Sequence, residues 1–316
     1  MFQKLRHTVY RLKYVHAPKL NLSKPVDVSL ELSSYCTNSC NYCYHADARN
    51  LPFKRGFMSK DLAFKIIKES AEIGVHSLKF NFRGESTMNK HFKDITHYAK
   101  SLASGSTFID RLTNSNFNFP YSRDDIFEGL CDQTKVKISF DSFIKEIFEK
   151  QRKGSKYEST IANITKFYNW PGRKNEMVVQ AVRTTLNRNE DLEKEIKSRW
   201  PEATASIRDC VEGRVNKDLK DTVVRTRDSD NRQSCIQVHA RLMIGYDGKV
   251  QVCCPDIGSK LVIGDANKEH VKDIWQSKKA YDIRKSLKNK SAFELDPCKG
   301  CSSFESYKGF KPVWTS

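Results

Sequence analysis

Between residues 26 and 209 the sequence alternates regularly between strand-like and helix-like patterns. The strand patterns predict strands at 26–33, 76–85, 106–116, 134–142, 176–187 and 204–209. The helical patterns predict helices at 59–74, 90–103, 123–130, 143–151, 156–169 and 190–199. Six repeats of this kind favour a parallel sheet. Right-handed connections would curl that sheet into a partial (β/α)6, TIM-like barrel, so the expected fold class is α/β.

Side chains that can bind a metal or a ligand lie at or just past the ends of the predicted strands. They are Cys36, Glu85, Asn114, Asp141 and Asn187. Because the carboxyl ends of parallel strands meet at one end of a barrel, we expect these side chains to converge there. The sequence therefore predicts the functional site at that end.

Three cysteines, Cys36, Cys40 and Cys43, lie within eight residues directly after the first predicted strand. A loop this short can aim three sulfurs at one point, whereas a tetrahedral zinc or a cubane iron–sulfur cluster needs four ligands. Either a fourth ligand comes from elsewhere, or one iron stays open to a reacting molecule. A structural zinc site is the competing interpretation, although such sites usually combine two C-x2-C pairs.

A second group of cysteines follows residue 234. Its members are Cys235, Cys253, Cys254, Cys298 and Cys301. Residues 238–254 have the pattern of two short strands around a turn, and 270–289 predicts a helix. A small α+β metal-binding domain is expected at 235–305, with a zinc ribbon as the alternative. Cys131 and Cys210 stand alone, which is typical of small buried residues.

The pattern divides the chain into five expected segments. They are a basic extension (1–25), the barrel (26–209), a linker or mobile loop (210–234), the cysteine-containing domain (235–305) and a tail (306–316). The basic extension favours an amphipathic helix, lying either on the edge of the barrel or on a membrane or partner. The polar composition of 210–234 is what favours a linker there.

The net charge of +17 favours an acidic partner such as nucleic acid, a phosphorylated metabolite or an anionic lipid. Because Lys and Arg are spread along the whole chain, a solvated basic surface is the alternative. No apolar run is long enough to span a bilayer, and the N-terminus lacks the apolar centre of a signal peptide. Ten cysteines in 316 residues are too few for a disulfide scaffold, so a cytoplasmic location is expected.

The C-x3-C-x2-C loop, with Tyr42 before its last cysteine, resembles that of the radical S-adenosylmethionine (radical SAM) superfamily. The resemblance implies that Cys36, Cys40 and Cys43 hold a 4Fe–4S cluster whose fourth iron binds S-adenosylmethionine. An electron from the cluster would then cleave this cofactor and release a 5′-deoxyadenosyl radical, which abstracts a hydrogen atom from unactivated carbon.

Further residues match the superfamily one by one. Residues 83–86, Arg-Gly-Glu-Ser, stand where relatives carry Gly-Gly-Glu-Pro, so two positions match while Arg83 and Ser86 depart. Ser139 lies in a segment similar to the Ser-x-Asp segment of the fourth strand, and Arg152 follows where some relatives place an arginine on the cofactor carboxylate. The residues implied to bind the cofactor are Tyr42, Gly84, Glu85, Ser139 and Arg152.

The spacing of the later cysteines resembles the Twitch domain, a shortened form of the SPASM extension. The resemblance implies that Cys235, Cys253, Cys298 and Cys301 hold one auxiliary 4Fe–4S cluster, because no cysteine follows Cys301. Cys254 is ambiguous, and a Gly-x4-Cys count favours Cys253. The combined resemblance covers about residues 26–305.

Two such clusters imply a two-electron oxidation, a dehydrogenation, of a small anionic or sugar-like substrate. A flavodoxin- or ferredoxin-type protein would donate the initial electron. Cys210, at the end of the sixth predicted strand, is a candidate hydrogen donor. Two alternatives stay open: epimerisation or crosslinking of a peptide or RNA, and a non-enzymatic binding protein whose metals are structural.

Overall fold

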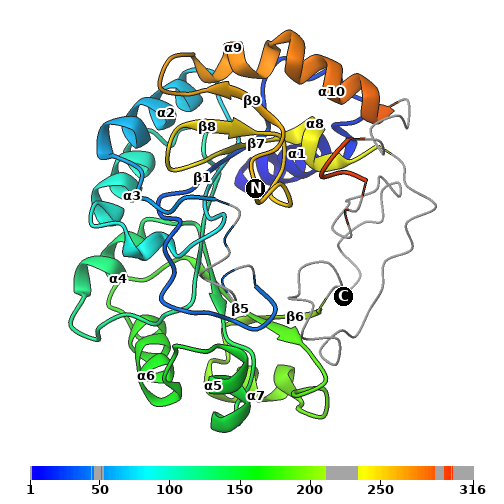
Figure 1. The fold of residues 1–316 in the computed structure, drawn as a ribbon. Helices are drawn as coiled ribbons and strands as arrows, with labels where there is room; N and C mark the ends of the chain where they lie inside the picture. Colours follow the sequence, from blue (N-terminus) through cyan, green and yellow to red (C-terminus); the bar gives the residue numbers. More distant parts are fainter. Residues whose placement is uncertain are drawn as a thin grey trace.

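A computed structural model describes residues 2–43, 45, 51, 53–210, 234–288, 295–299 and 301. Within these residues nine strands form one curved sheet in the order β6-β5-β4-β3-β2-β1-β7-β8-β9 (Figure 1). Six parallel neighbours make the barrel part: β1 (Asp27–Leu30), β2 (Ser77–Phe80), β3 (Asp110–Ser115), β4 (Lys135–Ser139), β5 (Glu176–Arg183) and β6 (Thr204–Asp209). The predicted partial (β/α)6 barrel is confirmed.

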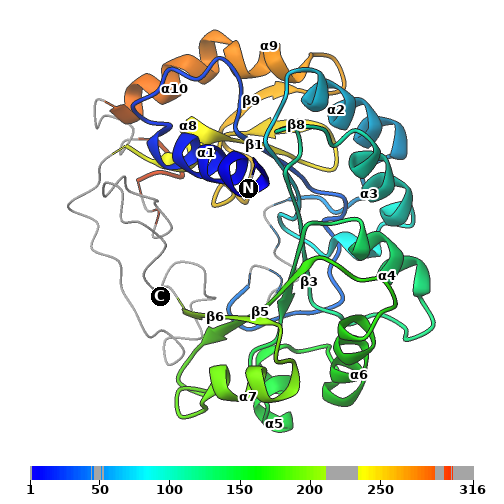
Figure 2. The ribbon, with the colours of Figure 1, turned by 180° about the vertical axis from the view of Figure 1, so that it is seen from behind.

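Helices cover the outer side of this sheet, as the two opposite views show (Figures 1 and 2). They are α2 (Lys60–Glu72), α3 (Phe92–Ser101), α4 (Asp124–Cys131), α5 (Lys145–Gln151), α6 (Tyr157–Tyr168) and α7 (Leu192–Arg199), with a short 3-10 turn, η2 (Ser86–Met88), before α3. Every helix predicted in this region is present, and α2 begins at its expected cap, where Ser59 accepts a hydrogen bond from the Leu62 amide.

Strand β1 shows how the two faces of the sheet differ. Val28 and Leu30 are fully buried in the main apolar core, between the sheet and the helices. Because successive side chains in a strand point to opposite faces, Asp27, Ser29 and Glu31 point to the concave side, where they are also buried. The inside of the barrel is therefore lined by charged and polar groups.

Helix α1 (Phe2–His16) lies on the concave side, at the end of the barrel where the strands begin (Figure 2). The Tyr10 hydroxyl donates to Asp110 Oδ2 at 3.4 Å, and Arg241 donates to the Tyr14 hydroxyl at 3.1 Å. The N-terminal extension thus forms a helix that closes the barrel opposite the cysteine loop. None of the helices in the described part of the chain has the length and apolar character needed to cross a bilayer.

The sheet continues past residue 234. After α8 (Ile236–Ala240), β7 (Arg241–Ile244) pairs in parallel with β1, and β8 (Lys249–Gln251) and β9 (Val262–Asp265) follow antiparallel. The expected hairpin is present, and its turn uses Gly248 at φ 82°, a conformation that favours glycine. The sequence pattern of this segment did not predict α8 or β9. Barrel and C-terminal segment share one sheet.

The single helix predicted at 270–289 is wrong. The structure has two helices, α9 (Val271–Gln276) and α10 (Lys278–Lys288), separated by Ser277. Ser277 is extended, with ψ 149°, and its hydroxyl accepts a hydrogen bond from the Ala280 amide, so it caps the second helix. Residue 289, the linker between 210 and 234, and the tail at 306–316 lie outside the described residues.

Candidate cluster and cofactor site

The three-cysteine loop begins against the segment that follows β2. A Cβ atom on Gly84 would collide with the carbonyl oxygens of Ser33 and Tyr35, so only glycine allows this close approach. The Glu85 amide donates to the Tyr35 carbonyl at 2.8 Å. The predicted cofactor motif and the first residues of the cysteine loop are therefore in direct backbone contact.

The other side of the loop rests on the turn after α5. The Ser39 amide donates to the Lys153 carbonyl at 2.7 Å, and the Asn41 amide to the Gln151 carbonyl at 3.1 Å. The Asn38 side chain donates to the Ser155 hydroxyl at 2.7 Å. Backbone and side-chain hydrogen bonds thus hold the loop from two sides.

Two polar side chains approach the thiols. Asn116 Nδ2 lies 3.7 Å from Cys36 Sγ, and Arg152 Nη1 lies 3.8 Å from Cys40 Sγ. Burial raises the pKa of Cys40 to about 11, and the Arg152 guanidinium acts against this rise. Burial, with the Glu85 carboxylate, also raises the pKa of Cys36. A metal centre bound to Cys36 and Cys40 would favour their deprotonated thiolate form over the thiol form.

Asp141 brings two of the predicted cofactor residues together. Its carboxylate is fully buried and accepts hydrogen bonds from the Tyr42 hydroxyl, from Arg152 Nη2 at 3.1 Å and from the Val182 amide at 2.9 Å. Arg152 Nε also lies 2.9 Å from Asp141 Oδ2. Asp141 stood at a predicted strand end, but only the structure reveals that it orients Tyr42 and Arg152.

Glu85 acts within the protein. Its carboxylate accepts hydrogen bonds from the Asn116 amide at 2.8 Å and from the Thr87 hydroxyl at 2.8 Å. Burial raises its pKa, while these hydrogen bonds lower it. Its side chain thereby joins the ends of β2 and β3.

Ser139 and Cys210 lie further from the loop along the sheet. The Ser139 hydroxyl donates to Asn114 Oδ1 at 3.4 Å, at the ends of β4 and β3. Cys210 directly follows β6, is buried, and donates its amide to the Arg183 carbonyl at 2.9 Å. Because β6 is the edge strand farthest from β7–β9, Cys210 is separated from the second cysteine group by the width of the sheet. Its role as hydrogen donor stays a prediction.

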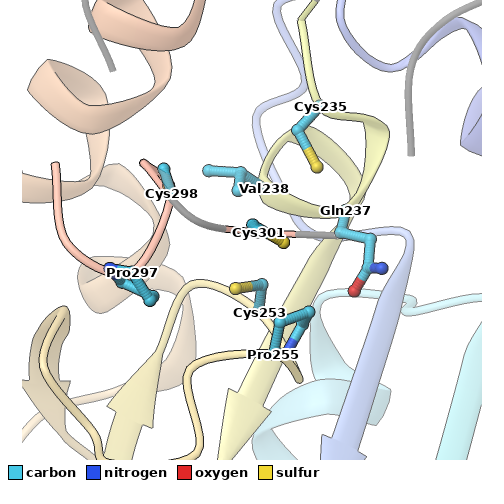
Figure 3. A pocket seen from close by; sticks show the side chains of 8 residues that line it. All are labelled: Cys235, Gln237, Val238, Cys253, Pro255, Pro297, Cys298 and Cys301. Carbon is cyan, nitrogen blue, oxygen red and sulfur yellow. The ribbon is translucent and has the colours of Figure 1, made fainter. Parts of the chain in front are cut away.

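The four later cysteines line one small cavity, together with Gln237, Val238, Pro255 and Pro297 (Figure 3). The sulfurs of Cys235, Cys253 and Cys301 surround the same space in this view. Cys254 does not line the cavity, and its thiol donates instead to Gln237 Oε1 at 3.1 Å. The structure therefore groups Cys253, and not Cys254, with the other three.

Neither group closes on a single ion. Within the described ranges no three His, Cys, Asp or Glu side chains are spaced to hold one metal ion. A cubane cluster needs a wider ligand set, because each thiolate binds a different iron atom. The soft thiolate donors and their grouping fit iron–sulfur clusters, with Cys36, Cys40 and Cys43 as ligands of one and the four cavity cysteines as ligands of the other.

The C-terminal segment matches a family model described as SPASM, an iron–sulfur cluster-binding domain, over residues 235–302. Among curated proteins, the S-adenosyl-L-methionine-dependent 2-deoxy-scyllo-inosamine dehydrogenase of Niallia circulans is 31% identical over 75 residues. That match covers 24% of this chain and 30% of the relative, so it spans less than a third of the relative's length.

Three solved structures share the fold over most of this chain. BtrN in complex with AdoMet and 2-DOIA has a TM-score of 0.56 and 18% identity, over 90% of this chain and 96% of that one. Streptococcus suis SuiB bound to S-adenosylmethionine has a TM-score of 0.64 and 16% identity, over 92% and 77%. Native anSMEcpe with bound AdoMet has a TM-score of 0.62 and 17% identity, over 87% and 86%.

Proposed function

We propose that this radical SAM enzyme, which carries a C-terminal iron–sulfur domain of the SPASM type, oxidises a small anionic or sugar-like substrate by two electrons. The observation that carries the proposal is the separation of the cysteines into two sites. Cys36, Cys40 and Cys43 follow β1 at the mouth of the barrel, and four others line a cavity beside β7 and β8. Three thiolates would leave one iron of the first cluster open to S-adenosylmethionine, whereas four would close the second cluster.

The cofactors are S-adenosylmethionine and two 4Fe–4S clusters. When bound, these groups would supply two things: a 5′-deoxyadenosyl radical, which takes a hydrogen atom from the substrate, and an acceptor for the second electron. A proton would leave the substrate to a base. The protein itself holds the cofactor-binding loops together through Gly84 and Asp141, and it shields the reaction within the barrel. A flavodoxin- or ferredoxin-type protein is the proposed electron donor, and the cytoplasm, where thiols stay reduced, is the proposed location.

The charges inside the barrel support an anionic substrate. Asp27 pairs with both Lys79 and Arg241, so one carboxylate is shared by two cations and a net positive charge remains there. Lys137 lies on the same concave face of β4, two residues before Ser139, and has no hydrogen-bond or ion-pair partner among the described residues. Burial and the nearby Arg208 lower its pKa to about 8. Among the described residues, Asp110 acts against this lowering, and a substrate phosphate or carboxylate beside Lys137 would favour its charged form further.

The similar proteins support both a small substrate and the first alternative, a peptide. The curated relative is a dehydrogenase of a small amino cyclitol, 2-deoxy-scyllo-inosamine, whereas SuiB is also known bound to a precursor peptide. The partly buried Lys137, inside a barrel with an excess of positive charge, favours the small anion over a peptide or RNA. The non-enzymatic alternative, a protein with structural metals, predicts metal binding without cleavage of S-adenosylmethionine.

Anaerobic reconstitution with iron and sulfide is expected to load about eight irons per chain, in two 4Fe–4S clusters. With dithionite as reductant, the loaded protein is expected to cleave S-adenosylmethionine to 5′-deoxyadenosine and methionine. Iron analysis and chromatography measure the two results. Tight zinc binding without cleavage would reject the proposal.

Replacing Lys137 with Met is expected to stabilise the protein at pH 7 by about 1–2 kcal/mol, since it removes a partly buried, unpartnered cation. The pKa of Lys137 falls from 10.5 to about 8 on folding, so the unfolded chain binds more protons between these values and wild-type stability rises with pH there. The gain from Lys137→Met should therefore shrink above pH 8. Urea unfolding at pH 7 and 9.5 tests this.

The matched control is Lys194→Met, because Lys194 is exposed on α7. The free energy of unfolding of the Lys194→Met variant is expected to stay within about 0.5 kcal/mol of the wild-type value. If Lys137→Met instead destabilises the protein at pH 7, the side chain has a partner that the proposal leaves out.

A further inference from the structure

Arg83 occupies the position where the superfamily pattern has glycine, and it connects the surroundings of both cysteine sites. Its guanidinium is almost fully buried and pairs with Glu31 through two parallel contacts, one of them from Nε to Oε1 at 2.7 Å. Its Nη1 donates to the Ile257 carbonyl at 3.2 Å and to the Ser259 hydroxyl at 3.3 Å. Both acceptors lie in the loop that follows Cys253.

The backbone of the same residue faces the first site. The His45 ring donates from Nε2 to the Arg83 carbonyl at 2.8 Å, and His45 follows the last cysteine of the first loop by two residues. The next residue, Gly84, lies against the backbone that leads into Cys36. Arg83 therefore contacts, with its main chain, the residue that follows the three-cysteine loop by two positions and, with its side chain, the Cys253 loop.

The surroundings make this connection rigid. The rings of Phe53 and Phe82 lie 4.5 and 4.8 Å from the guanidinium, which adds cation–π contacts and keeps water away. Glu31 also accepts a hydrogen bond from the Tyr246 amide, in the hairpin between β7 and β8, at 3.2 Å. A bidentate, buried arginine–carboxylate pair fixes orientation as well as distance. Lysine has no planar fork and cannot reproduce these contacts.

We propose that Arg83 is a positioning residue that sets the distance and orientation between the two cluster sites, and so controls electron transfer from the substrate to the auxiliary site. This inference rests on the proposed function. In that reaction the substrate loses a hydrogen atom to the deoxyadenosyl radical. The resulting substrate radical loses one electron to the oxidised auxiliary cluster and one proton to a base or water. Only the electron step depends on the separation of the two sites.

The test uses the reconstituted holoenzyme and the variant Arg83→Lys, which keeps the positive charge opposite Glu31. The probe is 2-deoxy-scyllo-inosamine, on which the similar dehydrogenase acts. Both clusters and 5′-deoxyadenosine formation are expected to persist, while oxidised product per 5′-deoxyadenosine falls about tenfold. Hydrogen exchange should rise in two separate segments, 35–43 and 255–262. Arg173→Lys is the control, since Arg173 is a largely buried arginine at a distant turn, where it donates to the Tyr168 and Asn175 carbonyls.

The outcomes separate the two hypotheses. If wild type makes no oxidised product, the proposed function fails, but hydrogen exchange still tests Arg83 because it needs no substrate. Faster exchange confined to residues 80–86 would show a purely local role and overturn the positioning role. Unchanged product per 5′-deoxyadenosine would overturn it as well. Should Arg83→Lys load iron poorly, the double variant Arg83→Met with Glu31→Gln removes both charges and allows the same two measurements.

Discussion

Replacing Cys36, Cys40 and Cys43 together with alanine is expected to abolish 5′-deoxyadenosine formation while one cluster remains. The three thiols are the proposed ligands of the cluster with an open iron, and no catalytic electron reaches S-adenosylmethionine without it. The four cysteines of the second cavity are separate from this loop, so they should still bind about four irons per chain. Iron analysis, electron paramagnetic resonance and chromatography of the cleavage products measure these results.

Two single-cysteine variants serve as controls for this experiment. The first is Cys131→Ala, at a residue that ends α4. The second is Cys254→Ala, which removes the thiol that donates to Gln237 and does not line the cavity. Both are expected to keep about eight irons and full cleavage. Cleavage that persists in the triple variant would place the reactive cluster elsewhere and refute the assignment of the first loop.

The second large effect is expected for Asp141→Asn. Asp141 is fully buried and holds both Arg152 and Tyr42, so the substitution leaves the guanidinium charge unbalanced beside Cys40. Removing one partner of a buried ion pair typically costs about 3–5 kcal/mol. We expect a loss of this size in urea unfolding of the cluster-free protein, and weaker S-adenosylmethionine cleavage after reconstitution.

Two comparisons isolate the cause of the loss. Asp125→Asn removes an exposed carboxylate paired with Arg123 and should cost less than about 1 kcal/mol. Adding Arg152→Gln to Asp141→Asn removes the uncompensated charge and should restore part of the stability. A loss below about 1 kcal/mol for Asp141→Asn alone would mean that solvent reaches the pair.

Much of the fold was predictable because local patterns determine it. The alternation of strands and helices from β1 to β6 follows apolar periodicity, and Ser59 and Gly74 mark the ends of α2 as capping rules predict. The cysteine loops were predictable for the same reason, since the spacing of Cys36, Cys40 and Cys43 is itself local. These signals need no knowledge of the tertiary structure.

The positioning residues were not predictable, because their partners lie far away in the sequence. Arg83 contacts Glu31 across 52 residues and Ile257 across 174. At the level of sequence it was only a departure from a glycine pattern. The break at Ser277 was missed for a different reason: a serine inside a helical pattern is common, and only its extended backbone turns it into a cap.

The place of β1 in the sheet has a consequence for synthesis on the ribosome. β1 is an early strand of the chain, yet one of its two neighbours, β7, begins at Arg241. Until that residue emerges, a nascent barrel exposes the unpaired edge of β1. Such edges promote misassembly, so we expect a nascent chain that stops before Arg241 to aggregate more readily than one that includes β7.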